Sequence, residues 1–358
     1  MPLSLEATDA DATVVQGPGA TAPRTDDMRG GLLRLHFERG HKARSLTWVD
    51  GSLVDIAGGH AVVRLDGSTG PAKRDWGFDF DRALVAPSGL RVLYGALGTK
   101  GLVASANSPV REIDRSYYRA NAFEYPVAVG ELPGGAEVLA HCPGGYYRIS
   151  VETLARGQRL CGASSSALDV FHSRLAFDRG GSYLLSAGWT GNATGVAMVF
   201  DIPEALGDSS HLDGPGLLPR SAIDGSVEGA CWLGPGLLAV STGPGPRHSD
   251  GGALPPRHLG LWSAEEGTWV SQARLRARTG TMHALGERLL CLFSHPRLVD
   301  PVSARDLQEW PDLDSGSQDS SVIWQLKDAP PPFAADPKSC RFAIAHGDVV
   351  TVVEVDQD

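Results

Sequence analysis

The apolar residues of this chain gather in short runs that are separated by turns and loops. The stretch "FHSRLAFDRGGSYLLSAGW" (171–189) contains an apolar run, a glycine turn, a second apolar run and an exit rich in small residues. Runs of this length are typical of strands and too short for helices. Only "IPEALG" (202–207) could form a single helical turn. The pattern therefore predicts an all-β protein.

The same unit recurs along the chain, each time with a further apolar run after a loop. Its turn glycines are Gly51, Gly89, Gly135, Gly181, Gly236 and Gly286. In the last unit Pro337–Lys338 takes the place of the glycine, and successive glycines lie between 38 and 55 positions apart. This spacing is close to the period of propeller blades, with insertions in the longer units. We expect a single seven-bladed β-propeller of four-stranded blades.

The two ends of the repeat region point to ring closure. The last unit stops after "VVTVVEVD" (349–356) with one strand missing, and "GGLLRLHFERG" (30–40) is a strand without a hairpin partner nearby. Since closure of the ring removes long exposed strand edges, we expect 31–37 to complete the last blade. Residues 1–28 are rich in Ala, Thr, Asp, Gly and Pro, which predicts a disordered tail before a propeller over 29–358.

The fourth unit carries a resemblance to a known family. Its opening His172–Ser173, its core "FDRGGSYLLSAG" (177–188) and its ending "VFD" (199–201) resemble the bacterial WD40-like β-propellers. The Trp-Asp pair that names that family is absent, and "FD", "LD" and "VD" stand in its place. The resemblance implies the propeller fold for nearly the whole chain from residue 30. It implies function less directly, because propellers include both binding scaffolds and enzymes.

Composition excludes several classes of partner. The net charge of −10 comes without a basic run, which argues against binding to a phosphate backbone. No stretch of eighteen apolar residues is present, and the first residues lack the features of a secretory signal. Five cysteines lie far apart, mostly in or beside apolar runs, as buried thiols of a reducing compartment would. We expect a cytoplasmic monomer with no nucleic-acid or membrane partner.

Histidines gather where enzyme chemistry could occur. The loops between second and third strands open on the face where first strands begin, called the top face here. Histidines in these loops are His60, His141, His295 and His346, with His248 in the insertion at 242–258 and His172 and His283 near first strands. Imidazoles from several blades could share one divalent metal ion. We therefore consider His60, His141, His295 and His346 as metal ligands and His172 and His141 as catalytic residues. In the alternative interpretation, these histidines have no catalytic or metal-binding role and occur there only because histidine suits the polar ends of turns.

Aromatic and basic residues favour the other interpretation, a binding module. The segment "DRSYYRANAFEY" (114–125) joins two blades and contains residues that often anchor protein contacts. The residues predicted to bind a protein partner or small ligand are Tyr117, Tyr146, Trp189 and Arg297. Packing of these side chains between blades is the competing explanation. No G-x-S-x-G or G-x-x-x-x-G-K-[ST] motif occurs, which argues against an α/β-hydrolase or a P-loop enzyme.

The leading prediction is a binding module that uses the top face, including the insertion at 242–258 and the segment 296–320. The alternative is an enzyme, a metal-dependent lyase, hydrolase or oxygenase, that uses the top-face histidines. The cofactor would then be a divalent metal ion, which the sequence does not identify.

Overall fold

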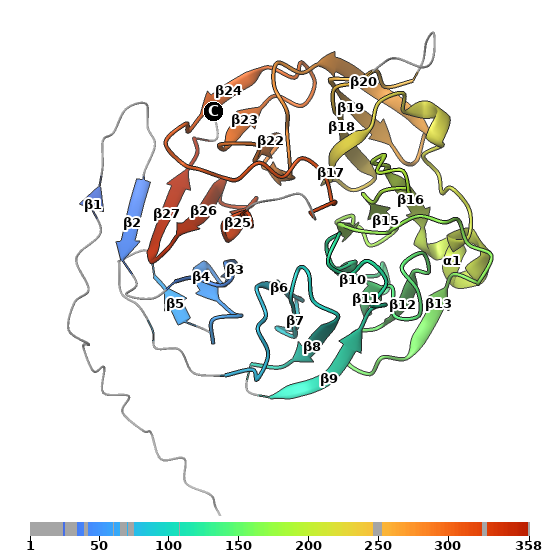
Figure 1. Ribbon diagram of the computed structural model, residues 1–358, viewed down its shortest axis with the longest axis horizontal. Helices are drawn as coiled ribbons and strands as arrows, with labels where there is room; N and C mark the ends of the chain where they lie inside the picture. The colour runs from blue at the N-terminus through green and yellow to red at the C-terminus, as the bar shows by residue number, and fades with distance from the viewer. Residues whose placement is uncertain are drawn as a thin grey trace, which may run out of the picture.

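The computed structural model describes residues 42–59, 61–64, 70, 75–106, 108–245, 253–323 and 328–356, and the backbone of β1 (Arg24–Thr25) and β2 (Arg34–Glu38). Its strands form seven antiparallel sheets arranged in a ring (Figure 1). The predicted seven-bladed β-propeller is therefore confirmed. In the described part of the chain, no helix is long and apolar enough to cross a membrane.

The blades follow one another in chain order. Blade 1 contains β3 (Thr47–Val49), β4 (Ser52–Asp55) and β5 (Ala61–Val63), and blade 2 contains β6 (Arg82–Val85), β7 (Arg91–Tyr94), β8 (Lys100–Ala104) and β9 (Pro109–Asp114). Blade 3 contains β10 (Val127–Glu131), β11 (Glu137–His141), β12 (Ser150–Thr153) and β13 (Arg159–Gly162). Blade 4 contains β14 (Leu175–Phe177), β15 (Tyr183–Ser186) and β16 (Met198–Asp201). Blades 5 and 6 contain β17 (Val227–Gly234), β18 (Leu237–Thr242), β19 (His258–Ser263) and β20 (Thr268–Arg274); and β21 (Met282–Leu285), β22 (Arg288–Cys291), β23 (Arg297–Val299) and β24 (Asp306–Glu309). Blade 7 contains β25 (Phe333–Asp336), β26 (Arg341–His346) and β27 (Val349–Glu354).

Three blades depart from the expected four strands in the described part of the chain, because the sheet of blade 7 has five strands and two other blades have fewer than four. Among the described residues, blades 1 and 4 each have three named strands. In blade 4 the chain leaves β16 into the short helix α1 (Ile202–Gly207), capped by the Asp201 side chain, which accepts a hydrogen bond from Glu204 N at 2.9 Å. Two 3-10 helices follow, η1 (Ser209–Leu212) and η2 (Arg220–Ala222). Between them the Leu217 N–H donates to the Val199 carbonyl at 2.7 Å, so irregular chain covers the outer edge of β16.

The repeated glycines occupy the turns between the first and second strands of six blades. All six have φ between +62° and +83°, a region that residues with a Cβ adopt at a cost. In the seventh blade this turn contains no glycine, and Cys340 takes the positive φ of 47°. The regularly spaced glycines therefore all adopt the same left-handed backbone conformation.

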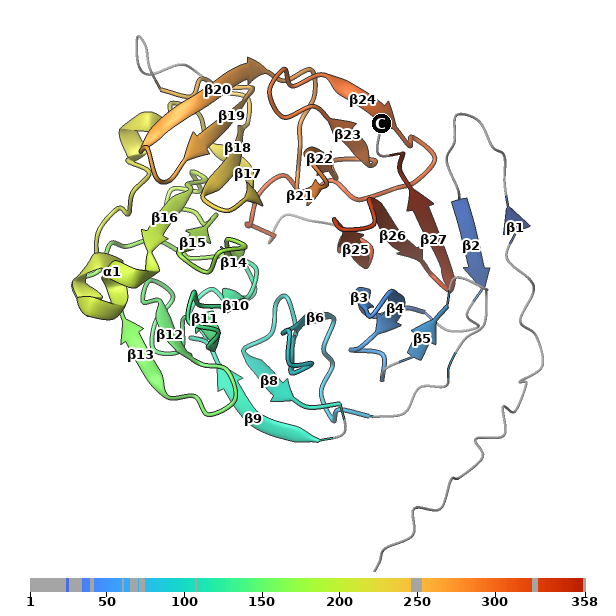
Figure 2. The ribbon, with the colours of Figure 1, turned by 180° about the vertical axis from the view of Figure 1, so that it is seen from behind.

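The ring is closed by the N-terminal part of the chain. β2 pairs antiparallel with β27, in a register from Arg34 opposite Val353 to Glu38 opposite Val349. Figures 1 and 2 show β2, in blue, beside β27, in red. β1 extends this sheet and falls within the segment 1–28; the rest of that segment lies outside the described residues. The predicted closure of the last blade by an N-terminal strand is confirmed.

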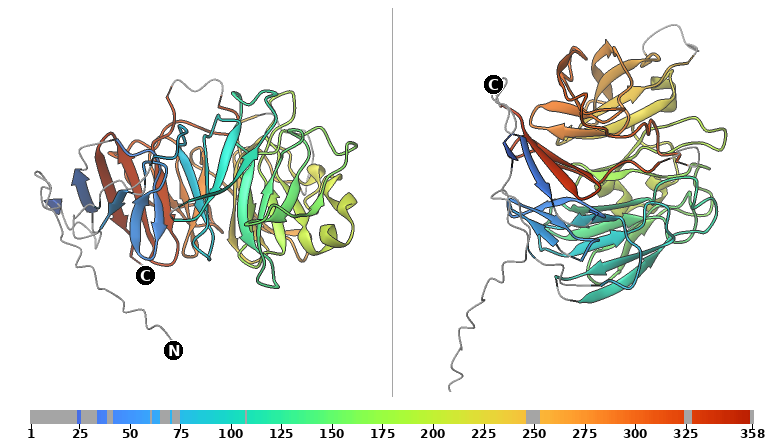
Figure 3. Two further views of the ribbon diagram at one scale, coloured as in Figure 1. Left: turned by 90° about the horizontal axis from the view of Figure 1, so that it is seen from below. Right: turned by 60° about the vertical axis from the view of Figure 1, so that its left-hand side comes forward.

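The hydrophobic core lies between neighbouring blades. Between blades 4 and 5, for example, buried Leu185 and Val199 pack in one cluster with Leu238 and Val240. All five cysteines are free thiols, and four of them are buried. Figure 3 shows the ring from the side, with the blades standing next to one another. Since strands alternate in direction within each blade, the loops after second strands and the connections into first strands meet at the top face.

Candidate functional site

His141 is held between two blades. Only 3% of the residue is exposed, and its Nε2 lies 3.3 Å from Glu152 Oε1 on the neighbouring strand β12. The same carboxylate lies 2.7 Å from an Arg111 guanidinium nitrogen on β9 of blade 2. Burial alone would raise the pKa of Glu152, but the hydrogen bonds and charges of His141 and Arg111 outweigh it and lower that pKa. The contact between Arg111 and Glu152 therefore links blades 2 and 3, and the His141 ring lies against the same carboxylate.

The other candidate metal ligands are tied to separate places. His295 Nε2 lies 3.4 Å from Glu309 Oε2 on the outer strand β24, and His346 Nε2 donates to the Asp314 carbonyl at 2.6 Å. His60 lies outside the described residues, as does His248. Across the described ranges, no group of three or more His, Cys, Asp or Glu side chains could hold a metal ion. The structure thus does not bring His141, His295 and His346 together, because each packs against a partner within its own part of the ring.

Two histidines near first strands have strongly lowered basicity. His172 is 2% exposed, with Nδ1 2.9 Å from Ser186 Oγ, and burial lowers its pKa to about 4. His283 lies against Phe333, with 4.8 Å between ring centroids; burial, aided by the charge of Arg174, lowers its pKa to about 4. Both rings are therefore neutral at pH 7. General acid–base catalysis near neutrality works best with a pKa near the working pH, which neither ring has.

The top of the central channel holds a partly buried ion pair. Arg174 Nε lies 3.2 Å from Glu124 Oε2, and the Gln318 side-chain amide donates to the other carboxylate oxygen. A second Arg174 nitrogen donates to the Ser320 carbonyl at 2.7 Å. Arg174, Glu124, Gln318 and His283 line a cavity of about 290 Å³ to which several blades contribute. No sequence pattern indicates this ion pair, because its members are far apart in the chain.

A segment after blade 6 crosses this region to the opposite side of the ring. Glu124 N donates to the Ser321 carbonyl at 3.2 Å, and Ile323 N donates to the Ala122 carbonyl at 2.9 Å. We call residues 314–323 the crossing segment. The central channel is thus narrowed at its top by backbone that links blade 6 to the start of blade 3.

Beside the channel, four aromatic rings form a continuous stack. Trp189, 6% exposed, lies under Phe171 with ring centroids 4.3 Å apart. Phe171 stacks on Tyr146 at 4.1 Å, and Tyr146 stacks on Tyr118 at 5.2 Å. Tyr118 is 54% exposed and neighbouring Tyr117 is 79% exposed. We call the stack of Trp189, Phe171, Tyr146 and Tyr118 the aromatic column; it runs from the interior to the top face.

The column is fixed by polar contacts at its middle and beside its exposed end. The Tyr146 hydroxyl donates to Asp169 Oδ1 at 2.6 Å, and burial together with this hydrogen bond raises the pKa of Tyr146 to about 12. Arg115, 3% exposed, donates to the carbonyls of Gly98 at 2.7 Å and Phe123 at 3.1 Å. It also donates to the Ala120 carbonyl. Burial lowers the pKa of Arg115 to about 10, so it stays charged at neutral pH while it holds the segment that presents both tyrosines.

Further apolar side chains are exposed on neighbouring loops of blade 2. Phe78 is 45% exposed in the connection before β6, and Leu97 is 49% exposed in the β7–β8 loop. Arg115 binds the carbonyls of Ala96 and Gly98 in that loop. The top of blade 2 therefore presents large apolar side chains from three connections.

The four residues predicted to bind a ligand or partner lie in different settings. Tyr117 and Tyr146 lie at or near the exposed end of the aromatic column, whereas Trp189 forms its buried base. Arg297 is 2% exposed and donates to Asp306 and to the Arg278 carbonyl within the outer part of blade 6. The aromatic composition of residues 114–125 pointed to this region, but Phe171 gave no comparable signal because it reads as an ordinary core residue.

Comparison with known proteins identifies the architecture. No protein-family model matches the chain, and no curated protein matches it. Among solved structures 1022 chains match, and so common a fold does not by itself indicate one function. One is a chain of the "Crystal Structure of Mitotic Checkpoint Complex", with a TM-score of 0.57, 12% identity and 99% of each chain covered. At this identity the likeness shows the fold alone, which is a seven-bladed β-propeller.

Proposed function

We propose that this protein is a WD40-like binding module that engages a protein partner through the top face of blades 2 to 4. The observation that carries the proposal is the aromatic column, with Tyr118 54% and Tyr117 79% exposed at its outer end. Exposure of a large aromatic side chain to water costs free energy, which a partner recovers by covering it. Such side chains contribute much of the binding free energy in many protein interfaces.

The support beneath these tyrosines adds to the argument. Tyr118 rests on the stacked rings of Tyr146 and Phe171, and buried Arg115 holds the backbone that presents it. A surface that is already ordered loses less conformational entropy when a partner binds. The likeness to a chain of a complex is consistent with a binding role but indicates no partner. The enzyme alternative has no comparable support, since the described histidines are separated or have low pKa values.

The experiment uses the full-length protein as bait in an extract of the cells that produce it, followed by purification of the captured partner. Calorimetry then compares the wild type with the double variant Tyr117→Ala/Tyr118→Ala. We expect at least a tenfold loss of affinity, in the range of interface hot spots. The matched control is Val270→Ala, since Val270 is 58% exposed on the outer strand β20. Equal affinity for the wild type and the double variant would overturn the proposal.

A further inference from the structure

A second feature of the top face is a pocket between blades 4 and 5. Its volume is about 670 Å³, within the usual range for small-molecule sites. Four top-face segments build its walls: the β13–β14 connection, the β15–β16 loop, the connection between blades 4 and 5, and the start of the β18–β19 loop. None of the aromatic column residues lines it. The pocket is therefore separate from the surface that the proposed function uses.

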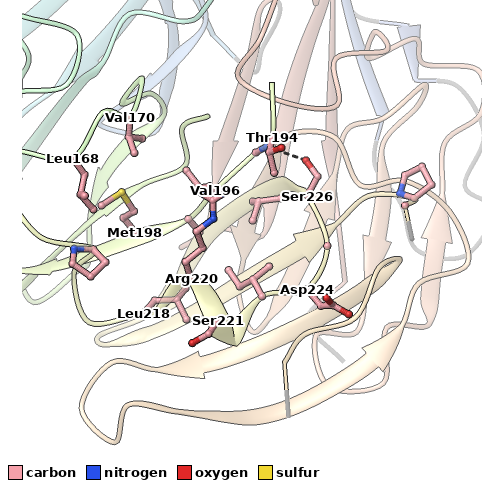
Figure 4. A pocket seen from close by; sticks show the side chains of 18 residues that line it. Leu168, Val170, Thr194, Val196, Met198, Leu218, Arg220, Ser221, Asp224 and Ser226 are labelled. Carbon is pink, nitrogen blue, oxygen red and sulfur yellow. Dashed lines mark hydrogen bonds between the residues drawn. The ribbon is translucent and has the colours of Figure 1, made fainter. Parts of the chain in front are cut away.

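The interior of the pocket is mainly apolar. Val170 and Met198 are each 6% exposed and Leu218 is 1% exposed, so they form a fixed wall. Leu168, at 45% exposed, lies at the rim. Figure 4 shows Leu168, Val170 and Met198 gathered on one side of the pocket and Asp224 on the other. Such a wall favours an aliphatic or aromatic group over a polar ligand.

One cation at this pocket has no partner among the residues that the structure describes. Arg220, on the 3-10 helix η2, lines the pocket and is exposed. Among the described residues, its guanidinium has no ion pair and no side-chain hydrogen bond. Asp224, the only acidic residue among the described residues of the lining, already has an interaction partner. The described lining thus combines an apolar wall with the positive charge of Arg220.

We propose that this pocket binds a small amphipathic carboxylate. The apolar body of the ligand packs against Val170, Met198 and Leu218, and the carboxylate pairs with Arg220. A guanidinium recognises a carboxylate through two parallel hydrogen bonds, which gives orientation as well as affinity. The inference goes beyond the proposed protein binding and does not depend on it.

The test titrates the full-length protein with octanoate and with octan-1-ol, which share an apolar chain and differ in charge. Binding is measured by displacement of the fluorescent apolar sulfonate 8-anilinonaphthalene-1-sulfonate. We expect octanoate to displace the probe saturably and octanol to bind about fivefold more weakly. Arg220→Gln should weaken octanoate about fivefold, as expected for a partly exposed charge pair, and leave octanol unchanged. The matched control is Arg179→Gln, at an exposed arginine in the β14–β15 turn on the opposite face.

Two further variants fill the pocket. Val196→Trp replaces a half-buried lining residue, and Ser221→Trp adds a ring at an exposed lining position where the core is not disturbed. Both should abolish displacement by octanoate while the melting temperature of Ser221→Trp stays at the wild-type value. The proposal is overturned if octanoate does not displace the probe, if octanoate and octanol bind equally, if Arg220→Gln has no effect, or if Ser221→Trp binds octanoate like the wild type.

Discussion

Single residues with the same place in the repeat have different packing. Gly89 and Gly181 both occupy the turn between first and second strands and both have positive φ, +83° and +68°. A Cβ on Gly89 would meet nothing within 4 Å, whereas a Cβ on Gly181 would lie 1.8 Å from the Glu131 carbonyl oxygen. The sequence pattern predicts the turn in both blades. It does not predict the close approach of blade 3, which depends on how neighbouring blades pack.

This difference gives a matched pair of variants. Gly89→Ala should lower the free energy of unfolding by about 1 kcal/mol, the cost of a left-handed conformation with a Cβ. Gly181→Ala carries the same cost and also forces backbone apart, so its loss should be at least about twice as large. Urea unfolding of both variants measures the difference. Equal losses would show that the contact at Glu131 is not as close as described.

The lowered basicity of His172 predicts a pH dependence of stability. Its pKa is about 4 in the folded protein and about 6.5 when unfolded, so the unfolded state binds more protons between these values. Stability contributed by neutral His172 is therefore present above pH 6.5 and lost as the pH falls toward 4, at about 1 kcal/mol per pH unit. His172→Asn, which keeps a polar group near Ser186, should reduce the change of the unfolding free energy with pH over this window and leave the part that His283 contributes. An unchanged pH dependence in the variant would contradict the burial of a neutral ring.

At the scale of elements, the sequence predicts what depends on local patterns. Short apolar runs, turn glycines and the missing strand of the last unit correctly predicted seven blades and the pairing of β2 with β27. The candidate site was harder to predict, because it depends on how strands pair and how blades pack. Arg174 meets Glu124, 50 positions away in the chain. His141 and Arg297 face Glu152 and Asp306 on the next strand, partners that no local pattern identifies. Tyr117 could be identified because aromatic residues cluster within one connection.

Ring closure by β2 predicts different outcomes for two truncations. Deletion of residues 1–28 removes β1 and leaves β2, so the edge of β27 stays paired. Deletion of residues 1–38 leaves the backbone of Val349–Val353 without its partner strand and should cause a large loss of stability or aggregation. Thermal melting and size-exclusion chromatography compare the two proteins. If the protein that lacks residues 1–38 is stable and monomeric, β2 does not hold the ring closed.

At the scale of the whole molecule, the centre of the ring is held by charge as well as by apolar packing. Arg174 of blade 4 contacts Glu124 before blade 3, the crossing segment through Ser320, and the Glu228 carbonyl of blade 5 at 3.1 Å. The Arg174 side chain is 10% exposed and that of Glu124 is 25% exposed. The ion pair is thus shielded from water and links parts of the ring that are distant in sequence.

Loss of this ion pair should lower the stability of the whole ring. Arg174→Met leaves the Glu124 carboxylate without its ion partner and should cost about 2–3 kcal/mol, less than for a fully buried pair because Glu124 is partly exposed. Asp79→Asn is the matched control, since it removes the pair with Arg44 in which the Asp79 side chain is 97% exposed. Chemical unfolding should show no change for the control. A similar stability of both variants would mean that the central pair contributes little.

The central claim is that the top face of blades 2 to 4 binds a protein partner, and site-specific crosslinking tests it most directly. A photoreactive benzoylphenylalanine is placed at position 117, which is 79% exposed on the top face, or at position 302, which is 60% exposed in the β23–β24 turn of the opposite face. After irradiation of cells that produce the protein, we predict a discrete crosslinked species from position 117 and none from position 302. Crosslinking from position 302 alone, or equally from both positions, would contradict the account.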